Sequence, residues 1–130
     1  MRTDLQELCR EATQGLPGAV ECCLLDATSG QPLARHLADR DGSEASARFA
    51  ALALTLLGPT GEQHLGALGL DPPAPSSASP ECHAIDRDLM GFARRLRRLD
   101  AVLVLTASAA SKVGQGWAVL GTTAARLESP

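Results

Sequence analysis

Residues 43–57 read SEASARFAALALTLL, and the helix that they predict is apolar on almost every side. Between positions 45 and 57 only one serine, one arginine and one threonine are polar. A surface helix normally has one apolar stripe and one charged face. One side of this helix can pack on a sheet, and something else has to cover the rest. The cover could be a second copy of the chain, a partner protein or the segment after Gly58, unless the domain encloses the whole helix.

Length and composition define the class of protein. The chain has 130 residues and a mass of 13.5 kDa, which predicts a single domain, 1–130. Its hydrophobic fraction of 45% and charged fraction of 21% are those of a folded globular chain. The net charge of −3 gives no sign of the basic surface that nucleic-acid-binding proteins carry, so we expect no nucleic-acid partner. Without a signal peptide or an apolar run of about 18–20 residues, we expect a soluble, cytoplasmic protein with no membrane span.

The predicted core is small and poor in large side chains. The chain has two Phe, one Trp and no Tyr, so Leu and Ala must fill most of the interior. Each buried Leu stabilises a fold by about 1.5–3 kcal/mol, which leaves a chain of this size little margin. A core shared with a second copy would relieve that shortage. We therefore predict a homodimer, and we expect its interface on one face of the second helix, at Phe49, Leu52, Ala53 and Leu56.

The flanking sequence predicts alternating helices and strands. Apolar spacing and turn residues indicate a helix over 3–15, a β-hairpin over 19–38, a buried strand over 101–107 and a final helix over 112–127. A short helical piece is expected at 62–70, and a Pro/Ser-rich loop at 71–80. Residues 81–100 stay ambiguous, because they fit either a hairpin or a helix. Their periodicity alone slightly favours the helix.

Three stretches of the chain resemble one known family. Residues 16–34, LPGAVECCLLDATSGQPLA, are similar to the opening hairpin of the Roadblock/LC7 family, which reads PGV-x-x-x-x-L-x-D-x-x-G-x-x-L-A. The sequence DGSE at 41–44, leading into the Ala/Leu helix, resembles the start of that family's long second helix. The strand at 101–107 and the helix after it resemble its ending. Gly58–Pro59 and the loop at 71–80 depart from the pattern.

The resemblance implies a fold and a role. The family fold is α-β-β-α-β-β-β-α, an α+β sandwich with a five-stranded antiparallel sheet, two helices on one face and one long helix on the other. It implies a hairpin at 81–100. Family members typically dimerise through antiparallel second helices and joined sheet edges. They serve as dynein light chains, as scaffolds and, in bacteria, as regulators of Ras-like GTPases. The resemblance thus implies a non-enzymatic homodimeric adaptor for a small Ras-like GTPase.

A second class of function stays open. Helices over an antiparallel sheet also form GAF, PAS and profilin-like modules that sense small molecules. Such a module needs a cavity with a few convergent polar groups. The scarcity of aromatic residues argues against a roomy one. No P-loop, GxSxG, HExxH or EF-hand pattern occurs, so we expect neither an enzyme nor a bound cofactor.

Two polar features remain as candidate sites. Four arginines, Arg94, Arg95, Arg97 and Arg98, form the one concentrated run of charge, which predicts either a solvated edge or a docking site for an acidic partner surface. The cysteines have no zinc-ligand spacing. We expect buried thiols, and the alternative is a redox or metal site that joins Cys82 and His83 to Cys22 or Cys23.

Overall fold

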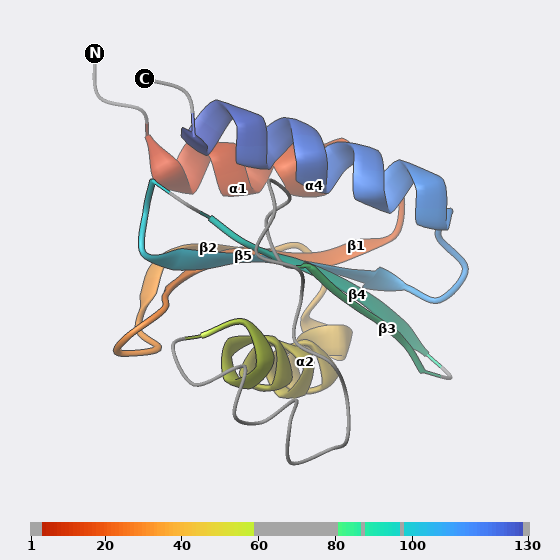
Figure 1. The fold of residues 1–130 in the computed structure, drawn as a ribbon. Helices are drawn as coiled ribbons and strands as arrows, with labels where there is room; N and C mark the ends of the chain where they lie inside the picture. Colours follow the sequence, from red (N-terminus) through yellow and green to blue (C-terminus); the bar gives the residue numbers. More distant parts are fainter. Residues whose placement is uncertain (1–3, 59–80, 87, 97, 129–130) are drawn as a thin grey trace.

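The computed structural model describes residues 4–58, 81–86, 88–96 and 98–128. Over these residues the chain forms a five-stranded antiparallel sheet with helices on both faces (Figure 1). The elements are α1 (Leu5–Gln14), β1 (Ala19–Asp26), β2 (Pro32–Leu37), the 3-10 turn η1 (Arg40–Gly42), α2 (Ser43–Leu57), β3 (Glu81–Ile85), β4 (Leu89–Arg95), β5 (Ala101–Ser108) and α4 (Val113–Glu128). The strand order is β2-β1-β5-β4-β3, so β2 and β3 are the two edges. This α+β architecture is the predicted one.

Residues 81–95 form a hairpin, which the resemblance implied and the periodicity did not favour. The helical spacing of this segment misleads because β4 is covered on both faces. Met90 and Phe92 pack under α1 and α4, whereas Leu89 and Ala93 pack under α2. A strand that is apolar on both faces contains apolar residues at helical spacing as well. The predicted helical piece at 62–70 and the loop at 71–80 lie outside the described residues.

The sheet separates two hydrophobic cores. Helices α1 and α4 cover one face, and α2 crosses the other (Figure 1). Strand β5 supplies both cores by alternation: Leu103 and Leu105 face α1 and α4, and Val102 and Val104 face α2. Burial on both faces explains why the central strands read as nearly continuous apolar runs. Within the described residues, no helix is long and apolar enough to cross a membrane.

Local signals in the sequence set the ends of these elements. Asp4 caps α1 by accepting hydrogen bonds from the backbone N–H groups of Gln6 and Glu7. Gly30 has a φ of 76°, a left-handed conformation that glycine adopts without strain, and it closes the turn between β1 and β2. Helix α2 ends at Leu57, and Gly58 follows in an extended conformation. The second helix is thus 15 residues long.

Candidate interaction surface on helix α2 and strand β3

Helix α2 uses only one of its apolar sides to pack on the sheet. Its buried residues are Ser46, Phe49, Ala53 and Leu57. The opposite side exposes Ala47, Ala51 and Leu52 around the exposed ion pair of Glu44 with Arg48, and Leu52 keeps 45% of its surface accessible. Part of the apolar helix surface expected from the sequence is therefore present, at Leu52 and the two alanines. This part faces outward from the protomer.

The structure corrects which residues lie on that outward side. Phe49 and Ala53 are 6% and 0% exposed because they fill the core between α2 and the sheet. Neither can reach a partner unless that core opens. Leu56 is half-buried, so Leu52 offers the most surface of the four predicted residues. Sequence reasoning missed Ala47 and Ala51, because a helix that is apolar all round does not reveal which side meets its own sheet.

Leu52 borders a groove between α2 and the β3–β4 hairpin. The groove has a volume of about 180 Å³, and Ala84, Leu89 and Gly91 form its wall on the sheet side. Gly91 makes room for the helix, since a Cβ atom there would lie 2.5 Å from the Phe49 ring. Arg48 and Asp86 stand at the polar margin of the groove. An apolar side chain could enter here between charged groups.

Strand β3 borders this groove and is an open edge of the sheet. It pairs with β4 alone. The backbone N–H of Asp86 donates to the carbonyl of Leu89, so by alternation the backbone groups of Glu81, His83 and Ile85 point away from β4. No group in the described part of the chain bonds to these outward N–H and C=O groups. As far as the described residues go, the edge is available for strand pairing.

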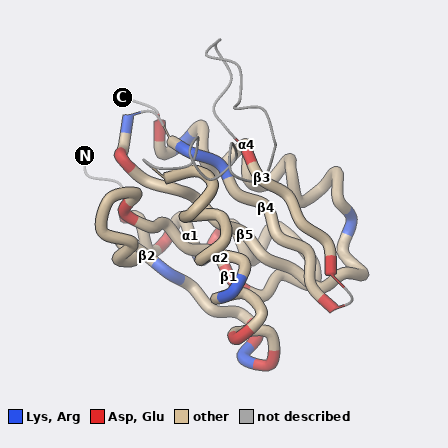
Figure 2. The backbone as a smooth tube through the Cα atoms, turned by 60° about the horizontal axis from the view of Figure 1, so that its bottom comes forward, with Lys and Arg blue, Asp and Glu red and all other residues tan. Residues whose placement is uncertain are grey.

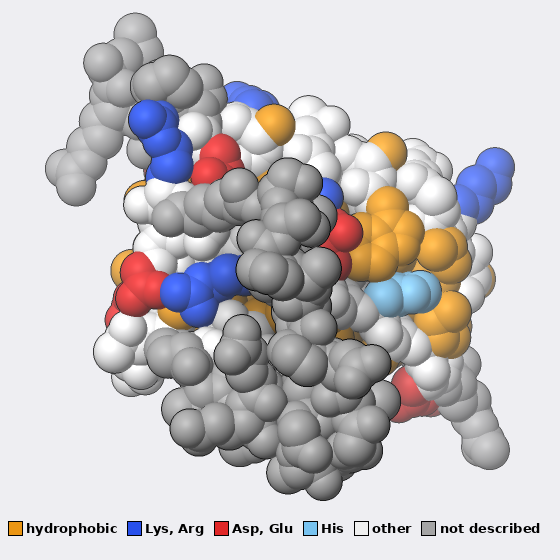
Figure 3. Space-filling view, viewed as in Figure 1, with side chains coloured by type: hydrophobic (Ala, Val, Ile, Leu, Met, Phe, Trp, Pro, Cys, Tyr) orange, Lys and Arg blue, Asp and Glu red, His pale blue; other side chains and the backbone are white. Residues whose placement is uncertain are grey.

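The other face of β3 carries an aromatic cluster with an apolar rim. The His83 ring stacks on Phe92 at a centroid distance of 4.8 Å, and Trp117 meets both rings edge-on. In the space-filling view, a histidine lies at the molecular surface among hydrophobic side chains (Figure 3). Ile85 is 60% exposed at the end of the strand. The histidine thus belongs to a packed ring cluster.

The arginine run does not form a free basic surface. Arg94 forms an ion pair with Glu81 at 2.6 Å, and Arg95 pairs with Asp100 and donates to the carbonyl of Leu57 at 2.9 Å. Arg98 donates to the carbonyl of Glu128 at 3.3 Å. Arg97 lies outside the described residues. Figure 2 shows basic and acidic residues interspersed along the described chain rather than gathered on one side. An acidic partner would have to displace these internal partners.

A buried polar network fixes α2 on the sheet, and sequence reasoning missed it. Glu21 on β1 is 3% exposed, and its carboxylate accepts hydrogen bonds from Arg35 on β2 and from Ser46 on α2, the latter at 2.7 Å. The Ser46 hydroxyl also lies 2.7 Å from that of Thr106 on β5. The hydrogen bond and charge of Glu21 raise the pKa of Arg35. One glutamate inside an apolar strand and one serine inside an apolar helix were the available signals.

This network decides the rotation of α2 about its axis. Ser46 can satisfy the Glu21 carboxylate only while it faces the sheet. With Ser46 held inward, Ala47, Ala51 and Leu52 are held outward. Every fully buried polar side-chain atom of the described residues has a hydrogen-bond partner. The outward apolar side is therefore a defined surface.

The cysteines do not assemble into a metal or redox site with His83. Cys82 lies on β3, three strands away from Cys22 and Cys23 on β1. In the described chain, no three Cys, His, Asp or Glu side chains are grouped to hold a metal ion. The Cys22 thiol is instead buried in the core near the Cys9 thiol, and its interaction with Cys9 together with burial raises the pKa of Cys22. Three of the cysteines are buried as expected, whereas Cys82 is only partly buried. Burial raises the pKa of Cys23 to about 12, so this side chain stays a thiol in the core.

Comparisons with known proteins place this fold. No family model and no curated protein sequence matches the chain. Among solved structures, MglC from Myxococcus xanthus has a TM-score of 0.64 at 18% identity, covering 96% of this chain and 97% of its own. A Roadblock/LC7 domain from Streptomyces avermitilis has a TM-score of 0.65 at 19% identity, covering 96% and 95%. MglB from Myxococcus xanthus has a TM-score of 0.66 at 13% identity, covering 97% and 93%. The chain has the Roadblock/LC7 fold.

Proposed function

We propose that this chain is a non-enzymatic homodimeric adaptor of the Roadblock/LC7 type that binds or regulates a small Ras-like GTPase. The observation that carries the proposal is the outward apolar side of α2 beside an open sheet edge, within this fold. The resemblance in the sequence implies the same assembly, with second helices packed together and sheets joined at an edge.

The proposed dimer pairs α2 with α2 and β3 with β3 across a two-fold axis. Leu52 of each copy then enters the groove between α2 and β3 or packs against its symmetry mate. Ala47 and Ala51 let the two helices approach closely. A stable interface of this kind buries more than about 1,000 Å² in total. The isologous geometry uses the same patch on both copies, so the assembly closes at two.

The role of the dimer is to bind one nucleotide state of the GTPase better than the other. Such an adaptor acts without donating a catalytic residue, because a difference in affinity is enough to shift the population of the GTPase. The arginine run at 94–98 remains a weaker proposal for a docking site. The arginines of this run that the structure describes already bond to other groups of the same chain.

Two measurements test this proposal. Sedimentation velocity of the full chain should give the mass of two copies. Calorimetry should then be performed with a small Ras-like GTPase from the same organism, loaded either with GDP or with a non-hydrolysable GTP analogue. We expect binding with at least about a tenfold preference for one nucleotide, a coupling of about 1.4 kcal/mol. Equal affinity for both states, or no binding, contradicts a regulatory role.

A second candidate function has one observation in its favour. A groove of about 310 Å³ lies between α2 and β2, with Leu25 and Leu54 on its walls and the Arg35–Glu21 pair in its lining. Its volume is at the lower end of the range for small-molecule sites. A ligand-sensing module would raise its unfolding temperature in a screen of nucleotides and metabolites. The adaptor should show no such shift, which separates the two functions.

A further inference from the structure

The two edges of the sheet differ in their backbone hydrogen bonding. An edge strand presents a row of unpaired N–H and C=O groups that can accept another strand. On β2, the N–H of Ala38, just beyond the strand, bonds to Val20, so by alternation the backbone groups of Arg35 point outward. Arg35 pairs with Cys23 near the middle of β2. A strand that adds to this edge at its centre would need both the N–H and the C=O group of Arg35.

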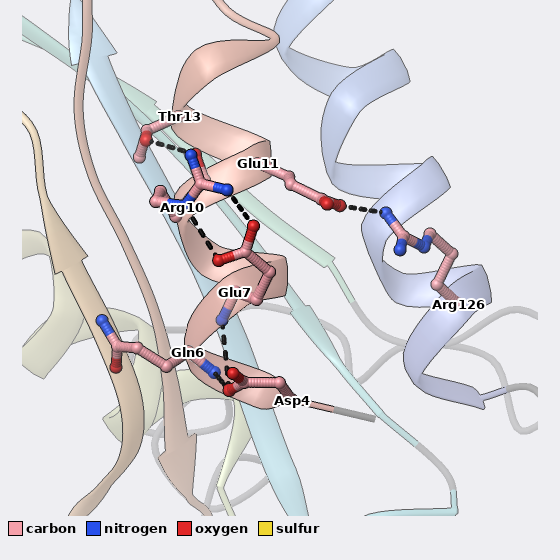
Figure 4. A network of polar contacts seen from close by, with 7 residues as sticks. All are labelled: Asp4, Gln6, Glu7, Arg10, Glu11, Thr13 and Arg126. Carbon is pink, nitrogen blue, oxygen red and sulfur yellow. Dashed lines mark hydrogen bonds and ion pairs between the residues drawn. The ribbon is translucent and has the colours of Figure 1, made fainter. Parts of the chain in front are cut away.

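Both of these groups are already taken by one side chain of α1. The Arg35 N–H donates to Oε1 of Gln6 at 3.1 Å, and Nε2 of Gln6 donates to the Arg35 carbonyl. A carboxamide has the donor and acceptor of a peptide group, so Gln6 bonds to β2 as one residue of a neighbouring strand would. Figure 4 shows the Gln6 side chain directed away from Arg126 on α4, on the opposite side of α1.

Strand β3 has no such cover from the described residues. Its outward groups at His83 and Ile85 stay free of backbone and side-chain partners there. Among the described residues, the sheet therefore has one edge whose central backbone groups are bonded, at Arg35, and one edge whose outward groups are unbonded, at β3. If both edges were open, copies could join β3 to β3 and β2 to β2 in turn, and the sheet would grow without limit.

We propose that Gln6 closes the β2 edge to strand pairing, so that a second copy of this chain joins the sheet only at β3. The inference deepens the proposed homodimer, and it rests on that function. It assigns to Gln6 a role in limiting assembly, separate from any part in helix formation. The Gln6 carboxamide does this without contributing to the dimer surface on α2 and β3.

The test replaces this side chain in the full chain. Gln6→Ala removes both hydrogen bonds while keeping a strong helix former at the position. Gln14→Ala is the matched control, because Gln14 is an exposed glutamine of α1 without a hydrogen bond in the described structure. Sedimentation velocity over a concentration series compares the masses. We expect Gln6→Ala alone to form species larger than wild type, in amounts that increase with concentration.

Two further readouts identify the mechanism. Amide hydrogen exchange at Arg35, measured at concentrations too low for Gln6→Ala to associate, should become roughly three- to tenfold faster in Gln6→Ala, the factor expected for one lost hydrogen bond. Leu33 takes no part in the pairing with β1, because the register shifts between Leu24 and Leu25. Leu33→Pro in the Gln6→Ala background should restore the wild-type mass, since proline obstructs a strand edge.

The outcomes are distinct. A Gln6→Ala protein with the mass of wild type, or with unchanged exchange at Arg35, overturns the inference. Larger species that persist with Leu33→Pro overturn strand pairing at β2 as their cause. The mass of Gln6→Ala is compared with that of wild type, whether wild type is a monomer or a dimer. If wild type is a monomer, the proposed homodimer fails, while association of Gln6→Ala alone still supports the closure of β2.

Discussion

Leu52→Glu is the substitution that most directly tests the proposed interface. Leu52 stands on the outward side of α2 with 45% of its surface accessible, and it borders the groove beside β3. The substitution leaves the core residues of α2 in place, because they point the other way. In the proposed dimer, however, it places two carboxylates in an apolar contact near the two-fold axis.

The magnitude follows from the exposed fraction. Complete burial of a leucine side chain is worth about 1.5–3 kcal/mol, so the accessible 45% of Leu52 can contribute about 1 kcal/mol in each copy. Two copies give about 2 kcal/mol. Leu52→Ala should therefore raise the dissociation constant about 30-fold. Leu52→Glu adds the cost of burying like charges without partners, so that dissociation should be complete.

Sedimentation velocity from about 1 to about 100 µM, a range that brackets micromolar association, provides the assay. Leu33→Glu is the matched control, because Leu33 is 49% exposed but lies on β2, at the other edge of the sheet. It should keep the wild-type mass. A dimeric Leu52→Glu protein with an unchanged dissociation constant would refute the assignment of this surface.

Three further predictions concern the fold that presents this surface. Gly116→Ala should destabilise the protein by about 1–3 kcal/mol, because the new Cβ would lie 2.3 Å from the ring of Phe92. Ser46→Ala should cost about 1–3 kcal/mol, since it leaves a buried carboxylate without one of its donors. Cys23 should make the protein sensitive to alkali. Its pKa is raised from 9.0 to about 12, so its contribution is complete below pH 9 and is lost as the pH rises, by about 1.4 kcal/mol at pH 10.

Urea unfolding measures all three, and each has a control. Gly121→Ala lies in the same helix with no atom within 4 Å of the new Cβ, and it should stabilise by about 0.5–1 kcal/mol. Thr55→Ala removes an exposed hydroxyl of α2 and should change stability by less than about 0.5 kcal/mol. Cys23→Ala should lessen the loss of stability between pH 8 and pH 10. Equal effects of variant and control would contradict the packing described for that site.

Outside residues 81–100, the sequence by itself predicted the described elements and their order, because the signals for them are local. Turn residues such as Gly30 and the apolar runs at 19–26 and 101–107 are readable without tertiary contacts. The sequence also predicted that the second helix is apolar on most of its sides, because this depends only on which residue types lie around the helix axis. The hairpin at 81–95 was not decided by periodicity, since a strand buried on both faces has no single period.

The tertiary structure alone decided which side of α2 is free and which sheet edge is open. Residues distant in sequence set the rotation of the helix, through Ser46, Glu21 and Thr106 on three different elements. The same is true of the β2 edge, which a glutamine 29 positions away occupies. Periodicity describes a helix or a strand in isolation, whereas exposure depends on what packs against it. That is why Phe49 and Ala53 belong to the core and Leu52 to the surface.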